Sequence, residues 1–332
     1  MRRMICLWGI VLLWSLCTGC SSSKIVEAGT LDKVAMELTD NGDELVKQKT
    51  IDLHRRFTMP DEVEIDVWVI NAKGKKSAKP RGTVILLHGM GEYKARYLGV
   101  GKNLANRGFD VVLIDLRCHG RSGGKYITCG AKEKQDVKTV LDTLIREKKV
   151  VPKPLYVFGV TFGGATAIQY AAIEPNVRCV IVIAPWKDTV SKARRDVGLL
   201  MSEEDFQKVL AEAGKIADFN PQTTSAVKDA AKLTCPVYII HGMFDWVVPL
   251  SDSQAILAVL PGPKKLKIIT PGPEQMVVGI GWETWVPEQI EKVVKGRIRR
   301  KPAPKPKPAR KARTKTPKKT RIKPKPEKVD KE

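Results

Sequence analysis

The stretch LYVFGVTFGGATAIQYAA, residues 155–172, decides how this chain is interpreted. Apolar residues lead into glycines that flank Thr161, and small residues that favour a helix follow. This order predicts a strand, a sharp turn and a helix, because glycine tolerates the backbone conformations that such a turn requires. A G-x-S-x-G turn normally presents a nucleophilic serine at its tip. The threonine here raises the question of whether the turn still supports chemistry.

Other short apolar runs surround this stretch, and none shows the alternation of a half-exposed strand. Together with the strand of the turn they are residues 83–88, 111–115, 155–160, 179–184, 237–241 and 266–270. Such runs fit strands that are covered on both faces. Residues 62–70 do alternate, which predicts one half-exposed strand. Helical patterns at 97–107, 133–149 and 164–173 lie between the runs. The sequence therefore predicts an α/β fold with a mostly parallel sheet flanked by helices.

The alternation of strands and helices stops at about residues 185–233. Ser202 and Asp205 have the spacing of a helix-capping box. After them Phe206, Val209, Leu210 and Ala213 fall on one helical face. We interpret this region as a small helical cap. It would lie over the carboxyl ends of the strands, where open sheets of this class bind ligands.

Four polar segments follow predicted strands, and the carboxyl ends of parallel strands meet at one edge of a sheet. The segments are HGMGEYKARY (88–97), DLRCHGRSGG (115–124), GVTFGG (159–164) and HGMFDWVVP (241–249). Their order and spacing resemble the α/β-hydrolase superfamily over about residues 63–294. The branch they resemble contains monoglyceride lipases, lysophospholipases and serine-aminopeptidase-like proteins. The resemblance implies an α/β-hydrolase fold and a serine hydrolase site.

The resemblance also implies a role for each residue of the site. Thr161 stands where the family places its nucleophilic serine, and Asp245 matches the acid of the catalytic triad. The backbone N–H groups of Met90 and Phe162 would form the oxyanion hole. The family's histidine is expected in the loop after the last strand, where this chain has Gln275.

The missing histidine is the main departure from the family pattern. The chain contains His54, His88, His119 and His241 only, and none is placed to act as a base for Thr161 unless His119 moves into that role. A glutamine amide cannot carry a proton near neutral pH, and loss of the histidine from a comparable triad costs on the order of 10⁶ in turnover. The extra methyl group of threonine also stiffens its side chain.

We therefore expect a catalytically degenerate hydrolase domain that serves as a binding or scaffolding module. One alternative is an active ester, lipid or amide hydrolase that uses Thr161 with a non-standard base. Glu274 with a raised pKa could supply that base, or a bound water could bypass Thr161. Another alternative is a structural envelope protein in which the two terminal segments matter most.

The N-terminus MRRMICLWGIVLLWSLCTGC resembles a bacterial lipoprotein signal, with residues 1–19 as the signal peptide and Cys20 as the lipidated residue. Its apolar run, Met4 to Leu16, is shorter than the roughly 20 residues of a membrane span. A plain secretory signal or an uncleaved anchor is the alternative. The resemblance implies a lipid-anchored protein of the bacterial cell envelope, and Ser21 favours the outer membrane. Residues 20–45 are interpreted as a tether and residues 46–296 as the hydrolase domain.

The C-terminal residues 297–332 hold 17 Lys/Arg, three Asp/Glu and seven prolines, and they supply most of the formal net charge of +22. This composition cannot build a core and predicts a disordered, extended arm. Such an arm binds polyanions through counterion release. Anionic envelope polymers are the expected partners. Nucleic acid is not expected, because no aromatic residues interrupt the basic run. A solubilising tail is the alternative.

The remaining candidates concern cysteines and tryptophans. Cys118 and Cys129 could pair in an exported protein, or all four body cysteines, which include Cys179 and Cys235, could be buried thiols. Their spacing matches no zinc site, and no cofactor is expected. Trp186, Trp246, Trp282 and Trp285 flank the four loops. They could line a pocket for a small-molecule or acyl ligand, or they could be packing residues.

Overall fold

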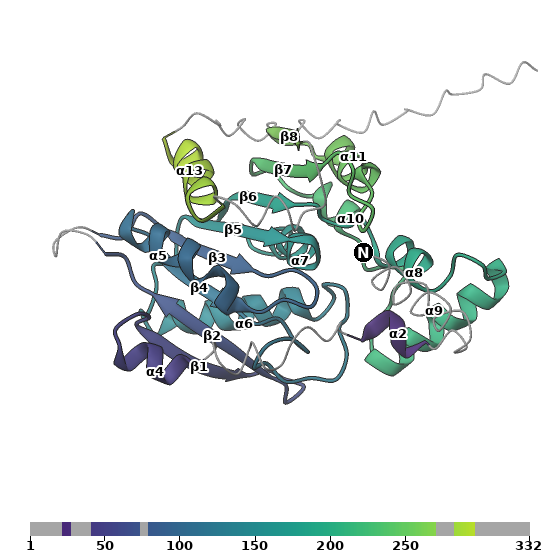
Figure 1. The fold of residues 1–332 in the computed structure, drawn as a ribbon, viewed down its shortest axis with the longest axis horizontal. Coiled ribbons are helices and arrows are strands. Elements are labelled where there is room, and N and C mark those ends of the chain that lie inside the picture. The colour runs from purple at the N-terminus through teal and green to yellow at the C-terminus, as the bar shows by residue number, and fades with distance from the viewer. Residues whose placement is uncertain (1–21, 28–40, 74–78, 270–281, 296–332) are drawn as a thin grey trace, which may run out of the picture. The chain divides into compact units, whose positions relative to one another are not determined.

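The computed structural model describes residues 22–27, 41–73, 79–269 and 282–295. Figure 1 gives their arrangement around an eight-stranded sheet of order β1-β2-β4-β3-β5-β6-β7-β8. The strands are β1 (Leu53–Thr58), β2 (Glu64–Ile70), β3 (Thr83–Leu87), β4 (Asp110–Ile114), β5 (Leu155–Val160), β6 (Val177–Ile183), β7 (Val237–Gly242) and β8 (Lys264–Ile269). Strands β3 to β8 run parallel, whereas β2 pairs antiparallel with both β1 and β4. The predicted mostly parallel sheet is confirmed.

Helices cover both faces of this sheet, which explains why every residue of β3, β4 and β5 is buried. The elements are η1 (Lys94–Tyr97), α5 (Leu98–Asn106), α6 (Glu133–Arg146), α7 (Thr161–Ala171), α10 (Ala226–Ala230), α11 (Leu250–Val259) and α13 (Trp282–Val294). Helices α5 and α13 pack together on one face, and α6, α7, α10 and α11 form a series on the other (Figure 1). Three predicted helices correspond to α5, α6 and α7.

Strand β1 is missing from the sequence prediction, and its position explains why. It lies at the edge of the sheet and pairs only with β2. In its sequence LHRRFT, Phe57 is buried while Arg55 and Arg56 are exposed. An edge strand needs no continuous apolar run, so its pattern is weak.

The cap consists of α8 (Thr189–Asp196) and α9 (Glu203–Ala217), which follow β6, whereas α10 at the end of the predicted cap region packs with α7 and α11 against the sheet. The predicted start of α9 is confirmed, because the Ser202 side chain accepts a hydrogen bond from the backbone N–H of Asp205 at 3.1 Å. Phe206, Leu210 and Ala213 are fully buried, as their common helical face predicts, and Val209 is half-buried.

The described parts of the segment interpreted as a tether are helical. Helix α2 (Ser23–Val26) buries Ile25 and Val26 in a small core that also contains Phe206 and Leu210 of the cap. Helix α4 (Gly42–Lys47) contacts β1. Its N-terminus is capped by Asn41, whose side chain accepts a hydrogen bond from the Glu44 N–H. Both helices are too short to give a periodic signal, so the polar composition of the segment concealed them.

Several predictions fall outside the described residues. These are the signal peptide 1–19, the lipidation site Cys20, the loop residues Glu274 and Gln275, and the arm 297–332. Within the ranges that the structure does describe, no helix has the length and apolar character needed to span a membrane.

Candidate active site

The turn at Thr161 has the geometry of a nucleophile elbow. Thr161 is the first residue of α7, directly after β5, and its φ of 41° lies in the left-handed region that side chains with a Cβ rarely adopt. A Cβ at Gly159 would lie 2.2 Å from the carbonyl oxygen of Gly163, and one at Gly163 would lie 2.4 Å from that of His88. The two glycines are therefore required by close backbone approaches, and they allow the strained turn to form.

The loop after β3 lies against this elbow. The Met90 N–H donates to Oγ1 of Thr161 at 3.3 Å, and the Gly163 N–H donates to the carbonyl of His88 at 3.1 Å. Glu92 supports the loop by accepting hydrogen bonds from the Gly89 N–H at 2.9 Å and from the Tyr97 hydroxyl at 2.6 Å. Phe162 follows Thr161 in the first turn of α7, where backbone N–H groups have no intrahelical acceptor. The two expected oxyanion donors are therefore close to the hydroxyl that they would serve.

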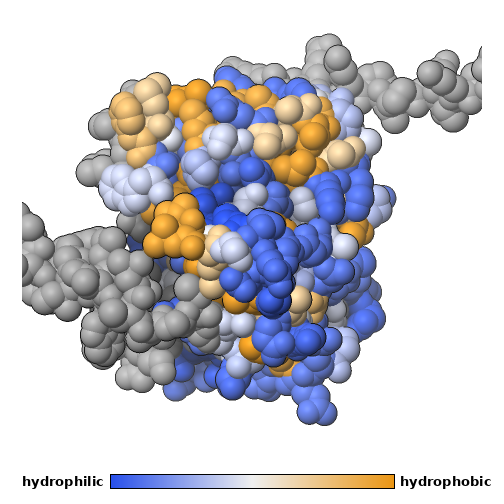
Figure 2. Space-filling model, turned by 90° about the vertical axis from the view of Figure 1, so that its right-hand side faces the viewer, coloured by the Kyte–Doolittle hydropathy of each residue, from blue (hydrophilic) through white to orange (hydrophobic). Residues whose placement is uncertain are grey.

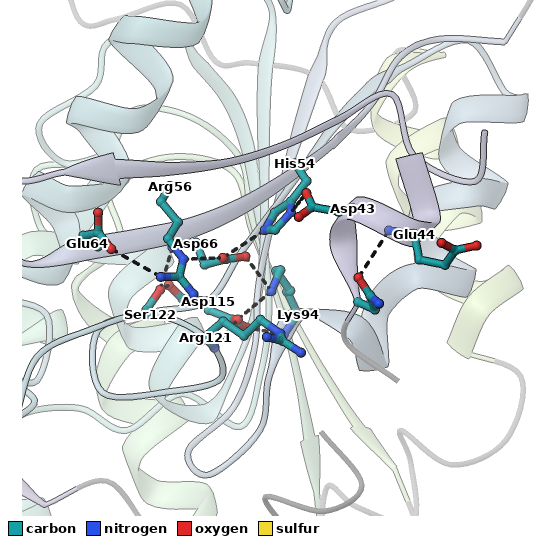
Figure 3. Close-up of polar contacts among 11 residues, drawn as sticks. Asp43, Glu44, His54, Arg56, Glu64, Asp66, Lys94, Asp115, Arg121 and Ser122 are labelled. Carbon is teal, nitrogen blue, oxygen red and sulfur yellow. Dashed lines mark hydrogen bonds and ion pairs between the residues drawn. The ribbon is translucent and has the colours of Figure 1, made fainter. Parts of the chain in front are cut away.

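A buried ion network holds the far end of this loop, as Figure 3 shows. The Lys94 ammonium lies 2.9 Å from Asp66 and 2.7 Å from Asp115, and all three side chains are fully buried. The Lys94 backbone N–H also donates to Asp115 at 2.6 Å, and the Arg121 N–H donates to the same carboxylate at 2.9 Å. The network therefore joins the oxyanion loop, β2 and the loop after β4. Burial raises the pKa of Asp66, but Lys94 outweighs it and the net pKa is lowered.

His54 extends the network to the N-terminal helix α4. Its ring nitrogens lie 3.0 Å from Asp66 and 2.7 Å from Asp43 (Figure 3). Burial lowers the pKa of His54, but the hydrogen bonds to Asp66 and Asp43 outweigh it, so the net pKa is raised. This residue is committed to the edge of the sheet and does not serve the elbow.

Asp245, the expected acid, lies in the turn after β7. Its Oδ1 accepts hydrogen bonds from the N–H groups of Val247 at 2.9 Å and Val248 at 2.8 Å. Its Oδ2 is buried and has no hydrogen-bond partner within the described part of the chain. The nearest ionisable contact of this oxygen is the His241 Nε2 at 3.7 Å. Asp245 is therefore held by its own turn, and one of its carboxylate oxygens has no partner in the ranges that the structure describes.

All four histidines of the chain lie in the described ranges, and none forms a hydrogen bond with Thr161. His88 bonds with the Gly89 carbonyl at 2.8 Å and the Leu116 N–H at 2.9 Å. His241 bonds with the Ser253 hydroxyl at 2.7 Å and the Val248 carbonyl at 2.8 Å. With His54 paired to two carboxylates, three of the four rings have both nitrogens occupied elsewhere.

Among the four histidines, His119 comes closest to meeting the requirements of a general base. Its Nδ1 lies 2.9 Å from the Arg117 carbonyl, so Nδ1 carries the proton and Nε2 has a free lone pair. That Nε2 is buried and has no partner among the described residues. The ring stacks on Phe162 with centroids 5.4 Å apart. Burial, with the neighbouring His88, lowers the pKa of His119 to about 4, which keeps the ring neutral at pH 7.

The cysteines and tryptophans differ in burial. Cys118, Cys129, Cys179 and Cys235 are free thiols, and burial raises the pKa of Cys118 and Cys129 to about 12. Trp186 is buried and contacts Phe162 at 5.5 Å between centroids. Trp285 is partly buried against the core, whereas Trp246 is 78% exposed. The side chain of Trp282 lies outside the described set. Across the described ranges, no group of three or more His, Cys, Asp or Glu side chains could hold a metal ion.

The structure places Thr161 in a sharp turn after β5, the Met90 N–H beside its hydroxyl, and Asp245 in the turn after β7. The sequence did not predict the buried Lys94 network or the Nε2 of His119, which has no partner among the described residues. Asp66 and Asp115 each end or interrupt an apolar run, and the only further signal is Lys94, four residues after the predicted oxyanion residue Met90. Nothing in the sequence fixes which of these charges meet, because they come from segments far apart in the chain.

The comparisons with known proteins agree with this geometry. The family model described as serine aminopeptidase, S33, matches residues 78–211. The monoacylglycerol lipase of Mycolicibacterium smegmatis is 24% identical over 226 residues, which cover 58% of this chain and 78% of the lipase. The uncharacterised protein YqkD of Bacillus subtilis is 26% identical over 252 residues, which cover 70% of this chain and 81% of YqkD.

Solved structures resemble the fold at low sequence identity. The esterase Pf2001 of Pyrococcus furiosus superposes with a TM-score of 0.58 at 22% identity, covering 75% of this chain and 95% of the esterase. The α/β-hydrolase GrgF of Penicillium has a TM-score of 0.59 at 17% identity, covering 74% of this chain and 98% of GrgF. These neighbours show that the chain has the α/β-hydrolase fold. The family match over residues 78–211 and the relatives make the chain similar to monoacylglycerol lipases and serine aminopeptidases.

Proposed function

We propose that this protein is a lipid-anchored component of a bacterial cell envelope whose α/β-hydrolase domain binds a ligand without turning it over. The observation that carries the proposal is the set of hydrogen bonds around Thr161. The hydroxyl accepts a bond from the Met90 N–H. The ring nitrogens of the four histidines have other partners, except the Nε2 of His119, which has none among the described residues.

The chemistry of acyl transfer explains why this arrangement disfavours turnover. A hydroxyl nucleophile needs a base that takes its proton and returns it to the leaving group. Gln275 stands in the family's histidine position and has no titratable nitrogen near neutral pH. An oxyanion hole and a shaped site alone leave on the order of 10³ to 10⁴ in rate over water.

What supports a binding role is the retention of the oxyanion loop. The Met90 N–H faces the elbow, and Glu92 and Lys94 fix the loop that carries it. A backbone N–H at this position can donate to a carbonyl or carboxylate oxygen of a ligand once Oγ1 of Thr161 rotates away. The likeness to a monoacylglycerol lipase suggests an acyl ester or a related amide as the ligand class.

The second candidate is an active hydrolase of esters, lipids or amides with a non-standard base. The Nε2 of the neutral His119 ring and the Oδ2 of Asp245 favour it, because neither atom has a partner within the described ranges. However, a histidine whose pKa lies at about 4 is a weak base. Glu274 belongs to a segment outside the described residues, so its candidacy rests on the sequence alone.

The test is hydrolysis of short acyl esters by the full chain and by the double variant Thr161→Ser/Gln275→His. We expect the unmodified protein to stay at the background rate and the double variant to gain at least about 10², since restoring a histidine base addresses a loss on the order of 10⁶. Thr166→Ser/Gln275→His is the matched control, because Thr166 is a buried threonine of the same helix that lies outside the elbow. A wild-type turnover above about 1 s⁻¹, ordinary for enzymes, would favour the second candidate.

A further inference from the structure

The cap contains the N-terminal segment as part of its core. Ile25 and Val26 of α2 are 0% exposed and pack with Phe206 and Leu210 of α9. The carbonyl of Val26 also accepts a hydrogen bond from the Ile127 N–H at 2.8 Å. Segment 22–27 is therefore a structural element of the cap.

This packing fixes where the chain enters the cap. Ser22 is the first described residue, two positions after Cys20, and only Ser21 lies between them. Two residues of extended chain span at most about 7 Å. A lipid attached at Cys20, which is part of the function proposed above, would therefore lie against the cap, and no long tether would separate the cap from the membrane.

The same cap exposes two adjacent leucines. Leu199 is 80% and Leu200 is 83% exposed in the loop between α8 and α9. Their neighbours Val197 and Met201 pack against the core that contains Ile25 and Val26, so the leucine loop and the chain entry belong to one small body. Transferring a leucine side chain out of water is favourable, so two leucines at one loop tip supply a driving force for docking.

The charges of the cap favour an apolar contact over an electrostatic one. Residues 185–233 contain eight Lys/Arg and eight Asp/Glu. Figure 2 looks onto the side of the molecule that carries the cap and shows apolar side chains scattered among hydrophilic ones. Such a surface can approach a bilayer without strong attraction or repulsion, and insertion of the leucines then decides the orientation.

We propose that the cap is the membrane-facing part of this protein and that Leu199 and Leu200 insert into the lipid surface beside the anchored N-terminus. This orientation places the site at the carboxyl ends of the strands next to the bilayer. The contact is apolar, so it resists salt, unlike a contact made by the basic arm.

The experiment uses the full chain in phosphatidylcholine vesicles with an environment-sensitive fluorophore on Leu199→Cys. Lys47→Cys is the control, because Lys47 is an exposed residue of α4, outside the cap. The unsubstituted protein, labelled in parallel, gives the background from native thiols. We expect the probe at 199 to shift to the blue and to be quenched by nitroxide-bearing lipids at both low and high salt. The probe at 47 should do neither, and Leu200→Asp should reduce the quenching at 199.

Acylation of Cys20 is measured on the same sample by mass spectrometry of the N-terminal peptide, which separates this proposal from lipid anchoring. Acylation without a shift at 199 would overturn the docking and leave the anchor intact. A shift without acylation supports the docking and removes the anchor. A shift that needs no vesicles and grows with protein concentration would assign the leucine loop to a second copy of the chain and overturn the proposal.

Discussion

Two aspartates follow parallel strands on the same edge of this sheet, Asp115 after β4 and Asp245 after β7, and their surroundings differ sharply. Asp115 accepts bonds from the Lys94 ammonium, the Lys94 N–H and the Arg121 N–H. Asp245 accepts two bonds from its own turn and leaves Oδ2 without a partner in the described chain. The first aspartate holds the loop that carries Met90, and the second is held by its own turn.

This difference separates two parts of the site. The residues of one part also stabilise the fold, whereas we expect the residues of the other part to contribute little to folding stability. The loop that carries Met90 is held by buried charges, and removing one of them would leave another uncompensated. Under the function proposed above, the carboxylate of Asp245 would serve proton transfer. We expect its loss to destabilise the fold less than the loss of a charge from the Lys94 network, because its hydrogen bonds stay within its own turn.

The largest expected effect is a contrast between the same substitution at the two aspartates. Asp115→Asn should lower the free energy of unfolding by about 3–5 kcal/mol, because it leaves the buried Lys94 ammonium with one carboxylate. Asp245→Asn should cost less than about 1 kcal/mol, because the turn bonds use Oδ1 and Oδ2 has no hydrogen bond with a described residue to lose. Denaturant titration of both variants measures the two values. Equal losses of unfolding free energy in the two variants would remove the distinction between the two aspartates.

A second contrast concerns the elbow itself. Gly163→Ala should destabilise the fold by about 2–3 kcal/mol, since its Cβ would lie 2.4 Å from two backbone carbonyl oxygens. Gly123→Ala is the matched control, because its Cβ would meet nothing closer than 3.4 Å, and it should cost about 1 kcal/mol or less. Thermal unfolding of both variants gives the comparison. A tolerated Gly163→Ala would show that the elbow is looser than its geometry indicates.

The smallest expected effect is a pH dependence of folding stability that comes from His54, at the edge of the Lys94 network. The pKa of His54 is raised in the folded protein by Asp66 and Asp43, against the effect of burial. The stability that His54 contributes is therefore present below the unfolded pKa of about 6.5 and is lost as pH rises through the folded pKa. His54→Gln should cost more unfolding free energy at pH 5 than at pH 9. A loss of unfolding free energy in His54→Gln that grows with pH would contradict the raised pKa of His54.

The sequence predicted the fold well where burial imposes a continuous pattern. The runs at 83–88, 111–115 and 155–160 became central strands because both their faces are covered. Edge strand β1 was missed for the opposite reason. Helix α2 was missed because its four residues are stabilised by tertiary packing of Ile25 and Val26, which no local pattern announces.

The site was predictable only where a motif is local. Glycine spacing placed Thr161, and the segments after β3 and β7 placed Met90 and Asp245. The ion pairs of Lys94 with Asp66 and Asp115 depend on which side chains the topology brings together. The same holds for the Nε2 of His119, which has no partner among the described residues. Hydrogen-bond partners of this kind follow from the three-dimensional arrangement and not from spacing.

Covalent labelling of the full-length, unmodified protein with a fluorophosphonate tests the central claim most directly, because the reagent reports an activated hydroxyl without any knowledge of the natural ligand. The account predicts no incorporation at Thr161 by intact mass, under conditions in which Thr161→Ser/Gln275→His becomes labelled. Stoichiometric labelling of Thr161 in the unmodified protein would contradict it, because such reactivity requires a base that serves this hydroxyl.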